Sequence, residues 1–179
     1  MAMSRIETAR LRLRPYGPGD LEHAVALYGD PKVTRFTKLG RLDRAQAEAI
    51  FAEHLALWES EGLGLYALTL KDSGAFVGEC GFFRVPERPE PYLRYALLRA
   101  HWGQGLAREA AVAVLGEAFG PRALGRVMSV VEARNGASQR IMELLGFRLD
   151  HDRLTPKGRI FVYALTAEHW AAGRTAPAG

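Results

Sequence analysis

The sequence predicts a single α/β domain built on a mixed β-sheet. The first observation is an extended apolar run at residues 95–98, which leads into a glycine-rich turn at 101–106. The second is a helical period of apolar residues at i, i+3, i+4, i+7, i+8 and i+11: Ala107, Ala110, Ala111, Val114, Leu115 and Ala118. The third is another apolar strand at 126–131, which completes a β–α–β unit and makes its two strands parallel, with a right-handed crossover.

Size and composition indicate an ordinary globular domain. The chain has 179 residues, of which 48% are apolar and 25% charged, enough for a substantial core. No apolar run approaches the roughly 18 residues of a membrane span, and the first residues lack the apolar centre of a signal peptide. A single cysteine, Cys80, excludes an internal disulfide. We therefore expect a cytoplasmic protein with no membrane partner.

The charge balance is mildly basic and carries little information about partners. The net charge of +4 comes mostly from arginine, which suits phosphate and carboxylate recognition. The sequence has no long basic tail, no zinc-ligand spacing and no aromatic–glycine RNA-binding signature. Nucleic acid is not predicted as the main ligand, and no metal site is predicted.

The first part of the chain predicts one strand and two helices. Apolar and charged residues alternate over 6–14, as in a half-exposed strand. Asp20 is a candidate N-cap for a short helix. Asp43 and Gln46 are spaced as a capping box that opens a longer helix, which Gly62 ends. His54 falls near the apolar stripe of that helix, either as a buried structural histidine or as a residue lining a substrate cleft.

The rest of the chain is richer in strands. Expected are strands at 65–70, 75–83, 92–98 and 126–131, a helix at 136–145, and a closing hairpin at 147–154 and 159–165. No repeat and no convincing linker interrupts them. We therefore predict one domain over 1–179, with a core at about 4–171 and a flexible tail at 172–179.

The glycine turn between strand and helix is the first candidate for chemistry. Such a turn leaves backbone N–H groups of a helix N-terminus free to hold an anion, most often a pyrophosphate. The pair Gly103 and Gly105 alone is a weak signal, because glycines also serve plain turns. The third glycine of a dinucleotide fingerprint and the Lys-Ser/Thr pair of a P-loop are absent. Any phosphate is therefore held by backbone amides.

The second candidate is the segment at 135–147. Asn135 is a good N-cap, Gly146 suits the C′ position, and the apolar positions expected to pack inward are Ile141, Leu144 and Leu145. Capping and packing account for most of this segment but do not explain the polar side chains of Asn135 and Ser138. Both stand at the mouth of a strand-to-helix turn, where a ligand thiol or amide can reach them.

Together, HWGQGLAREA and N-x-x-S-x-R-x-x-E-x-L-G-F resemble the GNAT superfamily of N-acetyltransferases. They are closest to its Rim-type branch, which acetylates N-terminal amines of ribosomal proteins and includes relatives acting on other amines. The opening ETARLRLRPYGPGD and the ending VYALTAEHW are also similar to that branch. Trp102 fits that branch as well, because the Rim-type branch commonly has Trp at this position, where the wider superfamily often has Arg or Gln.

The resemblance implies helices on both faces of the sheet and a splayed acetyl-CoA cleft between the strands at 92–98 and 126–131. The loop from Trp102 to Arg108 would bind pyrophosphate, and the strand at 97–99 would pair with the pantetheine arm. Asn135 would contact pantetheine or substrate, and Ser138 would lie near the thioester sulfur. The residues implied in acetyl-CoA binding are Leu97, Leu98, Arg99, Trp102, Gly103, Gln104, Gly105, Leu106, Ala107, Arg108, Asn135 and Ser138.

The implied reaction is acetyl transfer to a primary amine, with Ser138, Asn135 and Glu79 as candidate catalytic residues. The amine must lose a proton, the thioester oxygen needs a donor such as a backbone N–H near Leu97, and the leaving thiolate needs stabilisation. Related enzymes often carry a glutamate where this chain has Tyr92. The candidates left for the base are Glu79, Glu132, His101 and Glu90. Burial would raise the pKa of Glu79, but an ion pair with an arginine is the competing reading.

Two other classes of function stay open. A non-catalytic CoA-binding regulatory module would keep the same fold, and Tyr92 in place of the glutamate supports it. Another nucleotide binder using the glycine turn would normally carry the missing P-loop lysine or third glycine. The amine acceptor cannot be read from the sequence, and a homodimer is possible because dimers are common among relatives.

Overall fold

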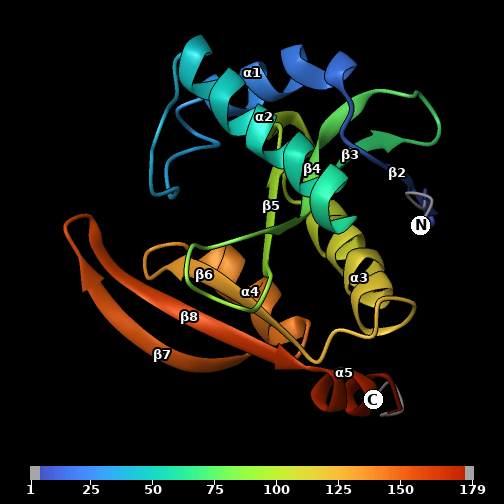
Figure 1. Ribbon diagram of the computed structural model, residues 1–179, viewed down its shortest axis with the longest axis vertical. Coiled ribbons are helices and arrows are strands. Elements are labelled where there is room, and N and C mark those ends of the chain that lie inside the picture. The colour runs from blue at the N-terminus through green and yellow to red at the C-terminus, as the bar shows by residue number, and fades with distance from the viewer. Residues whose placement is uncertain (1–4, 176–179) are drawn as a thin grey trace.

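The computed structural model describes residues 5–175, whose strands form one eight-stranded sheet in the order β1-β2-β3-β4-β5-β6-β8-β7 (Figure 1). The strands are β1 (Ile6–Glu7), β2 (Leu11–Pro15), β3 (Leu65–Leu70), β4 (Phe76–Phe83), β5 (Tyr92–Leu97), β6 (Arg126–Glu132), β7 (Arg148–Thr155) and β8 (Gly158–Thr166). The helices are α1 (Leu21–Gly29), α2 (Arg44–Glu61), α3 (Leu106–Phe119), α4 (Gly136–Leu144) and α5 (Ala167–Thr175). Two short 3-10 helices are η1 (Pro18–Asp20) and η2 (Arg99–His101).

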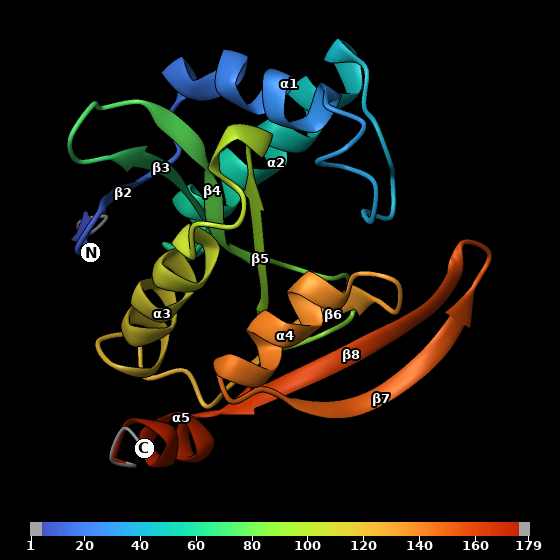
Figure 2. The same cartoon turned by 180° about the vertical axis from the view of Figure 1, so that it is seen from behind.

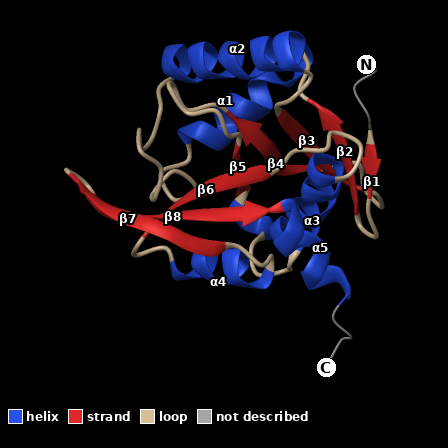
Figure 3. Ribbon diagram, turned by 60° about the horizontal axis from the view of Figure 1, so that its bottom comes forward, coloured by secondary structure: helices blue, strands red, loops and turns tan. Residues whose placement is uncertain are grey.

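Helices cover both faces of the sheet, as expected (Figure 3). Helices α1 and α2 lie on one face, where Leu27 and Phe51 pack with Ala67 of β3. Helix α3 lies on the other face, where Val114 packs with Leu93 of β5, and α4 adds Met142 to the same core. No helix of the described chain is both long and apolar enough to span a bilayer.

The N-terminal strand is divided, whereas the sequence predicted one strand over 6–14. A turn separates β1 from β2, which pair antiparallel with Ile6 opposite Leu13. The Thr8 hydroxyl oxygen accepts the Leu11 N–H at 2.9 Å, and the Thr8 N–H is donated to the Leu11 carbonyl at 3.0 Å. Short polar side chains compete for backbone groups in this way and turn the chain.

Helix ends follow the sequence closely. Asp43 accepts the Gln46 N–H at 2.9 Å and Gln46 accepts the Asp43 N–H at 3.0 Å, so the predicted capping box is confirmed. Helix α4 ends with Gly146 at φ 84° and with the N–H of Phe147 donated to the Met142 carbonyl.

One expectation for α4 is wrong. Leu144 is 44% exposed, and Met142 is the fully buried residue instead. Residues 142 and 144 lie about 200° apart around the helix axis, so only one of them can face the core.

Strand β4 carries two glycines because its neighbours approach closely. A Cβ on Gly78 would lie 2.1 Å from the Ala96 carbonyl oxygen, and one on Gly81 would lie 2.2 Å from that of Gly64. Their φ angles are 151° and 156°, outside the range that side chains favour. This tight packing holds Glu79, which lies between the two glycines, in the middle of the sheet.

Strands β5 and β6 are parallel and splay apart, which confirms both expectations. Strand β5 pairs with β4 along its length, from Leu97 opposite Gly78 to Tyr92 opposite Phe83. On its other side it pairs with β6 only where Tyr92 meets Met128. Figure 2 shows the two strands diverging beyond this point.

Helix α5 was not predicted. It follows β8 directly, and the Thr166 hydroxyl oxygen accepts the His169 N–H at 3.2 Å in its first turn. The helix extends to Thr175, so the first residues of the expected tail at 172–179 are helical and 176–179 lie outside the described residues.

Candidate active site

The glycine turn leads from β5 through η2 into α3. Gly103 and Gly105 have φ angles of 73° and 76°, and Gly105 is the N-cap of α3 with no side chain capping the helix. The first N–H groups of the helix are therefore free to receive an anion. Trp102 is 47% exposed, and its indole N–H is donated to the Leu97 carbonyl at 2.7 Å, which fixes the turn to the end of the strand.

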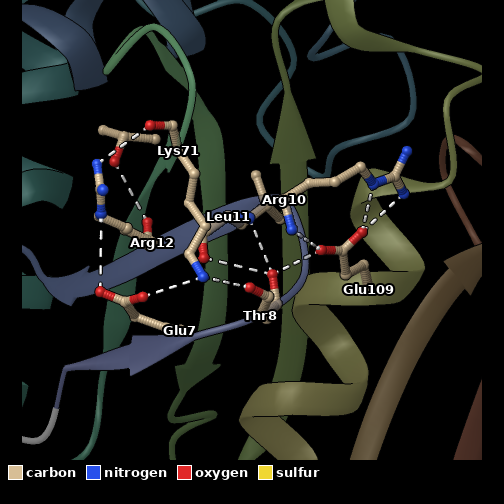
Figure 4. A network of polar contacts seen from close by, with 8 residues as sticks. Glu7, Thr8, Arg10, Leu11, Arg12, Lys71 and Glu109 are labelled. Carbon is tan, nitrogen blue, oxygen red and sulfur yellow. Dashed lines mark hydrogen bonds and ion pairs between the residues drawn. The ribbon is translucent and has the colours of Figure 1, made fainter.

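Residues of the β1–β2 turn brace the glycine turn. Arg10 donates from Nη1 to the Gln104 carbonyl at 2.8 Å. It also donates from Nε to Glu109 at 2.7 Å (Figure 4). Glu109 also accepts the Thr8 hydroxyl at 2.6 Å and the Arg10 backbone N–H at 2.8 Å. Burial disfavours the charged carboxylate, but these donors hold the pKa of Glu109 below its ordinary value. The sequence reading assigned no role to these residues, although the opening motif contains Thr8 and Arg10.

The edge of β5 that faces β6 becomes unpaired beyond the last contact between the two strands. The Pro91 carbonyl accepts the Met128 N–H at 2.9 Å, and the Leu93 carbonyl accepts the Ser129 hydroxyl at 3.1 Å. Alternate residues of a strand present their backbone groups to the same side. The N–H and carbonyl of Tyr95 and the N–H of Leu97 therefore face the splay, where an extended amide-containing ligand can pair with them.

This free edge lies about two residues earlier than the predicted one at 97–99. The Leu98 N–H is donated to the Val77 carbonyl at 2.9 Å, on the side away from β6. Arg99 belongs to η2 and has left the strand. Of the three residues expected to pair with the pantetheine arm, only Leu97 lies in the strand.

The start of α4 faces the same region of the sheet as Tyr95. The Asn135 side-chain oxygen accepts the Ser138 N–H at 3.2 Å, which confirms Asn135 as the cap of the helix. The Tyr95 hydroxyl is buried, and no residue among 5–175 completes a well-formed hydrogen bond with it. Burial raises the pKa of Tyr95 to about 12, and the adjacent Ser138 side chain opposes that shift. The splay thus brings a serine and a tyrosine hydroxyl close together.

On the opposite face of the sheet, Glu79 is the centre of a buried polar cluster. Its carboxylate is fully buried. One oxygen accepts the hydroxyl groups of Tyr16 at 2.9 Å and Tyr28 at 2.7 Å, and the other lies 2.8 Å from Nη2 of Arg94. Burial raises the pKa of both tyrosines and the Glu79 charge adds to the rise. Burial disfavours the Arg94 cation, but Glu79 holds the pKa of Arg94 above its ordinary value.

His54, in α2, lies on the same face of the sheet as the Glu79 cluster. The residue is 7% exposed, and its Nε2 has no hydrogen-bond partner in the described chain. Burial, together with the positive charge of Arg94, lowers the pKa of His54 to about 3, so the ring is neutral near pH 7. The histidine is buried, as one reading of the sequence expected, and it is also within electrostatic reach of a cation.

The other candidates for the base are distributed around the sheet. Glu132 forms an ion pair with Arg134, and Glu90 lies 4.0 Å from Arg126. His101 is in η2, beside the glycine turn. No group of three or more His, Cys, Asp or Glu side chains between residues 5 and 175 is placed to hold a metal ion.

Comparison with known proteins connects this geometry to one family. The acetyltransferase (GNAT) domain family matches residues 10–148. The uncharacterized protein YkkB of Bacillus subtilis is 31% identical, with 81% of this chain and 86% of that protein covered. The uncharacterized N-acetyltransferase p20 of Bacillus licheniformis is 26% identical, with 94% of this chain and 99% of that protein covered.

Solved structures agree in fold. The acetyltransferase from Agrobacterium tumefaciens superposes with a TM-score of 0.81 at 29% identity, over 92% of this chain and 95% of its own. RimL, a ribosomal alpha-N-protein acetyltransferase in complex with coenzyme A, superposes with a TM-score of 0.78 at 15% identity, over 91% and 98%. At that identity the likeness concerns the fold alone, and for the fold it agrees with the Rim-type resemblance.

Proposed function

Since the chain belongs to the GNAT acetyltransferase family, and is thereby an acetyl-CoA-dependent acyltransferase, we propose that it acetylates a primary amine by direct nucleophilic attack. The observation that carries the proposal is the splay of β5 from β6, which ends at an uncapped helix N-terminus. One end of this cleft suits a pyrophosphate and its edge suits a chain of amides.

In this proposal the donor is held mostly by backbone groups. The N–H groups from Gly103 to Arg108 receive the pyrophosphate, and Trp102 keeps the turn on the strand through its bond to Leu97. The exposed edge at Tyr95 and Leu97 pairs with the pantetheine arm. Asn135 caps the start of α4, and in this proposal Ser138 lies near the thioester sulfur.

The transfer forms a nitrogen–carbon bond and breaks the carbon–sulfur bond of the thioester. A backbone N–H of the β5 edge stabilises the charge that develops on the thioester oxygen. Ser138, with the Tyr95 hydroxyl beside it, donates a hydrogen bond to the departing sulfur. Glu79 stays a prediction as the base. Because its carboxylate is fully buried, a proton would have to reach it through the hydroxyl group of Tyr16 or Tyr28, both of which donate to it.

The decisive experiment measures thiol release with a panel of primary amines, together with acetyl-CoA binding by calorimetry. Gly105→Glu places a negative charge at the N-cap, and Gly105→Gln has the same size and the same backbone strain without the charge. We expect Gly105→Glu to weaken acetyl-CoA binding about 100-fold and Gly105→Gln to weaken it much less. Equal binding by wild type and Gly105→Glu would contradict the assignment of the turn.

A non-catalytic CoA-binding module is the second candidate, and two observations favour it. This chain has Tyr92 where the family resemblance implies a glutamate, and Glu79 has no exposed surface. Calorimetry that finds acetyl-CoA binding, with no thiol release from any amine offered, would favour this module over the enzyme. A cytoplasmic location and a homodimer stay predictions, which cell fractionation and sedimentation would test.

A further inference from the structure

Arg94 is a largely enclosed cation with unused hydrogen-bond donors. A guanidinium has five N–H donors. In the described chain only Nη2 has a polar partner, Glu79, while the face of the group lies 5.5 Å from the centre of the Tyr28 ring. The side chain is 28% exposed. The remaining donors are therefore not sealed in the core, and a ligand that reaches the exposed part of the side chain can accept hydrogen bonds from them.

His54 is a second polar group in the same situation, contributed by a different element. It is 7% exposed, its Nε2 has no partner in the described chain, and the positive charge of Arg94 acts on it. Arg94 lies against the ring of Tyr28 from α1, and His54 belongs to α2, so both lie on the face of the sheet that α1 and α2 cover. Arg94 thus has donors left over beside its ion pair with Glu79, and His54 has a ring nitrogen without a partner in the described chain, so one polar ligand could engage both.

The position of Arg94 relates this ligand to the cleft. Arg94 is two residues beyond Tyr92, the last residue of β5 that pairs with β6. Side chains alternate along a strand, so Arg94 faces α1 and α2 while Tyr95 faces α3 and α4. If the donor lies on the α3 and α4 side, as the proposed function has it, the acceptor must approach from the side of Arg94.

The surroundings of Arg94 favour a ligand that carries a carboxylate but has no net charge. Glu79 balances the charge of Arg94, and the neutral His54 adds none. Tyr16 and Tyr28 each donate to Glu79, at 2.9 and 2.7 Å, and so fix the carboxylate that orients Arg94. A planar guanidinium edge matches a carboxylate with two parallel hydrogen bonds. A zwitterion with one carboxylate and one ammonium leaves the neutral balance unchanged, whereas a phosphate dianion does not.

We propose that Arg94, oriented by Glu79 and assisted by the Nε2 of His54, binds the carboxylate of an amine acceptor of the α-amino-acid class. The proposal rests on the proposed acetyl transfer and names the substrate class for the same site. Glu79 is then a positioning residue, which acts on the acceptor through Arg94.

The test uses thiol release with matched acceptors: α-amino acids, their amides, and the corresponding amines without the carboxyl group. Wild type should prefer acids over amides by about tenfold or more in kcat/KM, as expected for a charged hydrogen bond in an enclosed site. Arg94→Gln should abolish this preference. Arg84→Gln, which changes an arginine paired with Glu61 outside the site, should keep it.

A second measurement guards against an unfolded Arg94→Gln variant. N-acetylated amino acids and their amides are compared as inhibitors of the wild type, where the acids should inhibit at about tenfold lower concentration. The double variant Glu79→Gln/Arg94→Gln removes both charges, and it should lose the preference for acids while keeping its fold.

The outcomes separate this inference from the proposed function. Equal kcat/KM for acids and amides in wild type, or release only with amines that lack a carboxylate, would overturn the inference and leave acetyl transfer standing. Acetyl-CoA binding with no release from any acceptor would overturn both the inference and the proposed transfer. Absence of acetyl-CoA binding would overturn the assignment of the donor cleft itself.

Discussion

The two faces of the sheet around β5 use polar groups in opposite ways. On the α3 and α4 face, the glycine turn and the splayed edge leave backbone N–H groups at the surface that have no partner within residues 5–175. On the α1 and α2 face, side chains of Tyr16, Tyr28, Glu79 and Arg94 are drawn together and largely enclosed. In the proposed function, the first region binds acetyl-CoA through its pyrophosphate and the amides of its pantetheine arm. The second region, with its specific side chains, selects the amine acceptor.

Because polar groups are exposed on one face and enclosed on the other, the two regions should contribute differently to the stability of the fold. The glycine turn depends on local backbone geometry and on braces at the surface, so changes there should affect binding more than folding. The cluster around Glu79 is part of the core, and a change that removes one partner leaves another charge buried and unpaired. Substitutions on the two faces should therefore separate binding from folding.

The largest expected effect is a loss of stability in Glu79→Gln. The substitution leaves the Arg94 cation enclosed without its counter-charge, and we expect the free energy of unfolding to fall by about 3 kcal/mol. Acetyl-CoA affinity of the folded fraction should stay within about twofold of wild type. The matched control is Glu61→Gln, which breaks the more exposed pair with Arg84 and should cost about 0.5 kcal/mol or less. Equal losses in denaturant unfolding would show that the two pairs are equivalent and would contradict the comparison.

The next effect is a loss of stability in acid that depends on His54. Its pKa is about 3 in the folded chain and near 6.5 when unfolded, so the unfolded state binds the extra proton between these values. Stability from this group is complete above about pH 6.5 and falls as the pH decreases toward 3. Between about pH 7 and pH 5 the loss should be about 2 kcal/mol. His54→Leu should remove most of this loss, while His23→Gln on the exposed side of α1 should keep it. A wild-type stability that does not change over this interval would contradict the burial of a neutral ring.

The two faces also differ in how far the sequence could predict them. The glycine turn and the Asn135 cap each lie within one short segment, so residue types at fixed spacing were enough to locate them. The sheet order near the cleft followed from one β–α–β unit. The cluster around Glu79 joins residues 16, 28, 54, 79 and 94, which come from separate elements. No local spacing in the sequence relates these residues. The sequence left open whether Glu79 acts as a base or pairs with an arginine, and only the structure shows its ion pair with Arg94. The division of the first strand depended on hydrogen bonds of one threonine, Thr8, which periodicity does not record.

A smaller effect is expected from Arg10→Ala, which removes the brace of the glycine turn. The Gln104 carbonyl loses its donor, and Glu109 becomes an uncompensated negative charge next to the anion site. We expect the KM for acetyl-CoA to rise about tenfold with little change in kcat, and the half-exposed Arg10 should contribute little to stability.

Adding Glu109→Gln to Arg10→Ala should recover part of the affinity for acetyl-CoA, because it removes the negative charge that repels the anion. Arg12→Ala is the neighbouring control, since Arg12 contacts Lys71 and Glu7 and should leave KM unchanged (Figure 4). A brace that only supports the fold would lower the unfolding temperature without shifting KM.

The smallest effect concerns the hydroxyl pair beside the cleft. Tyr95→Phe removes a buried hydroxyl that has no well-formed partner in the described chain, so stability should be unchanged or slightly higher. If this hydroxyl supports Ser138 at the departing sulfur, kcat should fall a few-fold to about tenfold while the KM for acetyl-CoA stays the same. Tyr92→Phe, at the closed end of the same strand, should leave kcat unchanged.

Ser138→Ala removes the other hydroxyl group, and the double variant Tyr95→Phe/Ser138→Ala shows how the two hydroxyl groups act. If the two hydroxyl groups act as one unit, kcat of the double variant should fall no further than in the more severe single variant. If they act independently, the fold-losses in kcat of the two single variants should multiply. A multiplicative loss would therefore separate Tyr95 from Ser138 and assign each its own contact with the thioester.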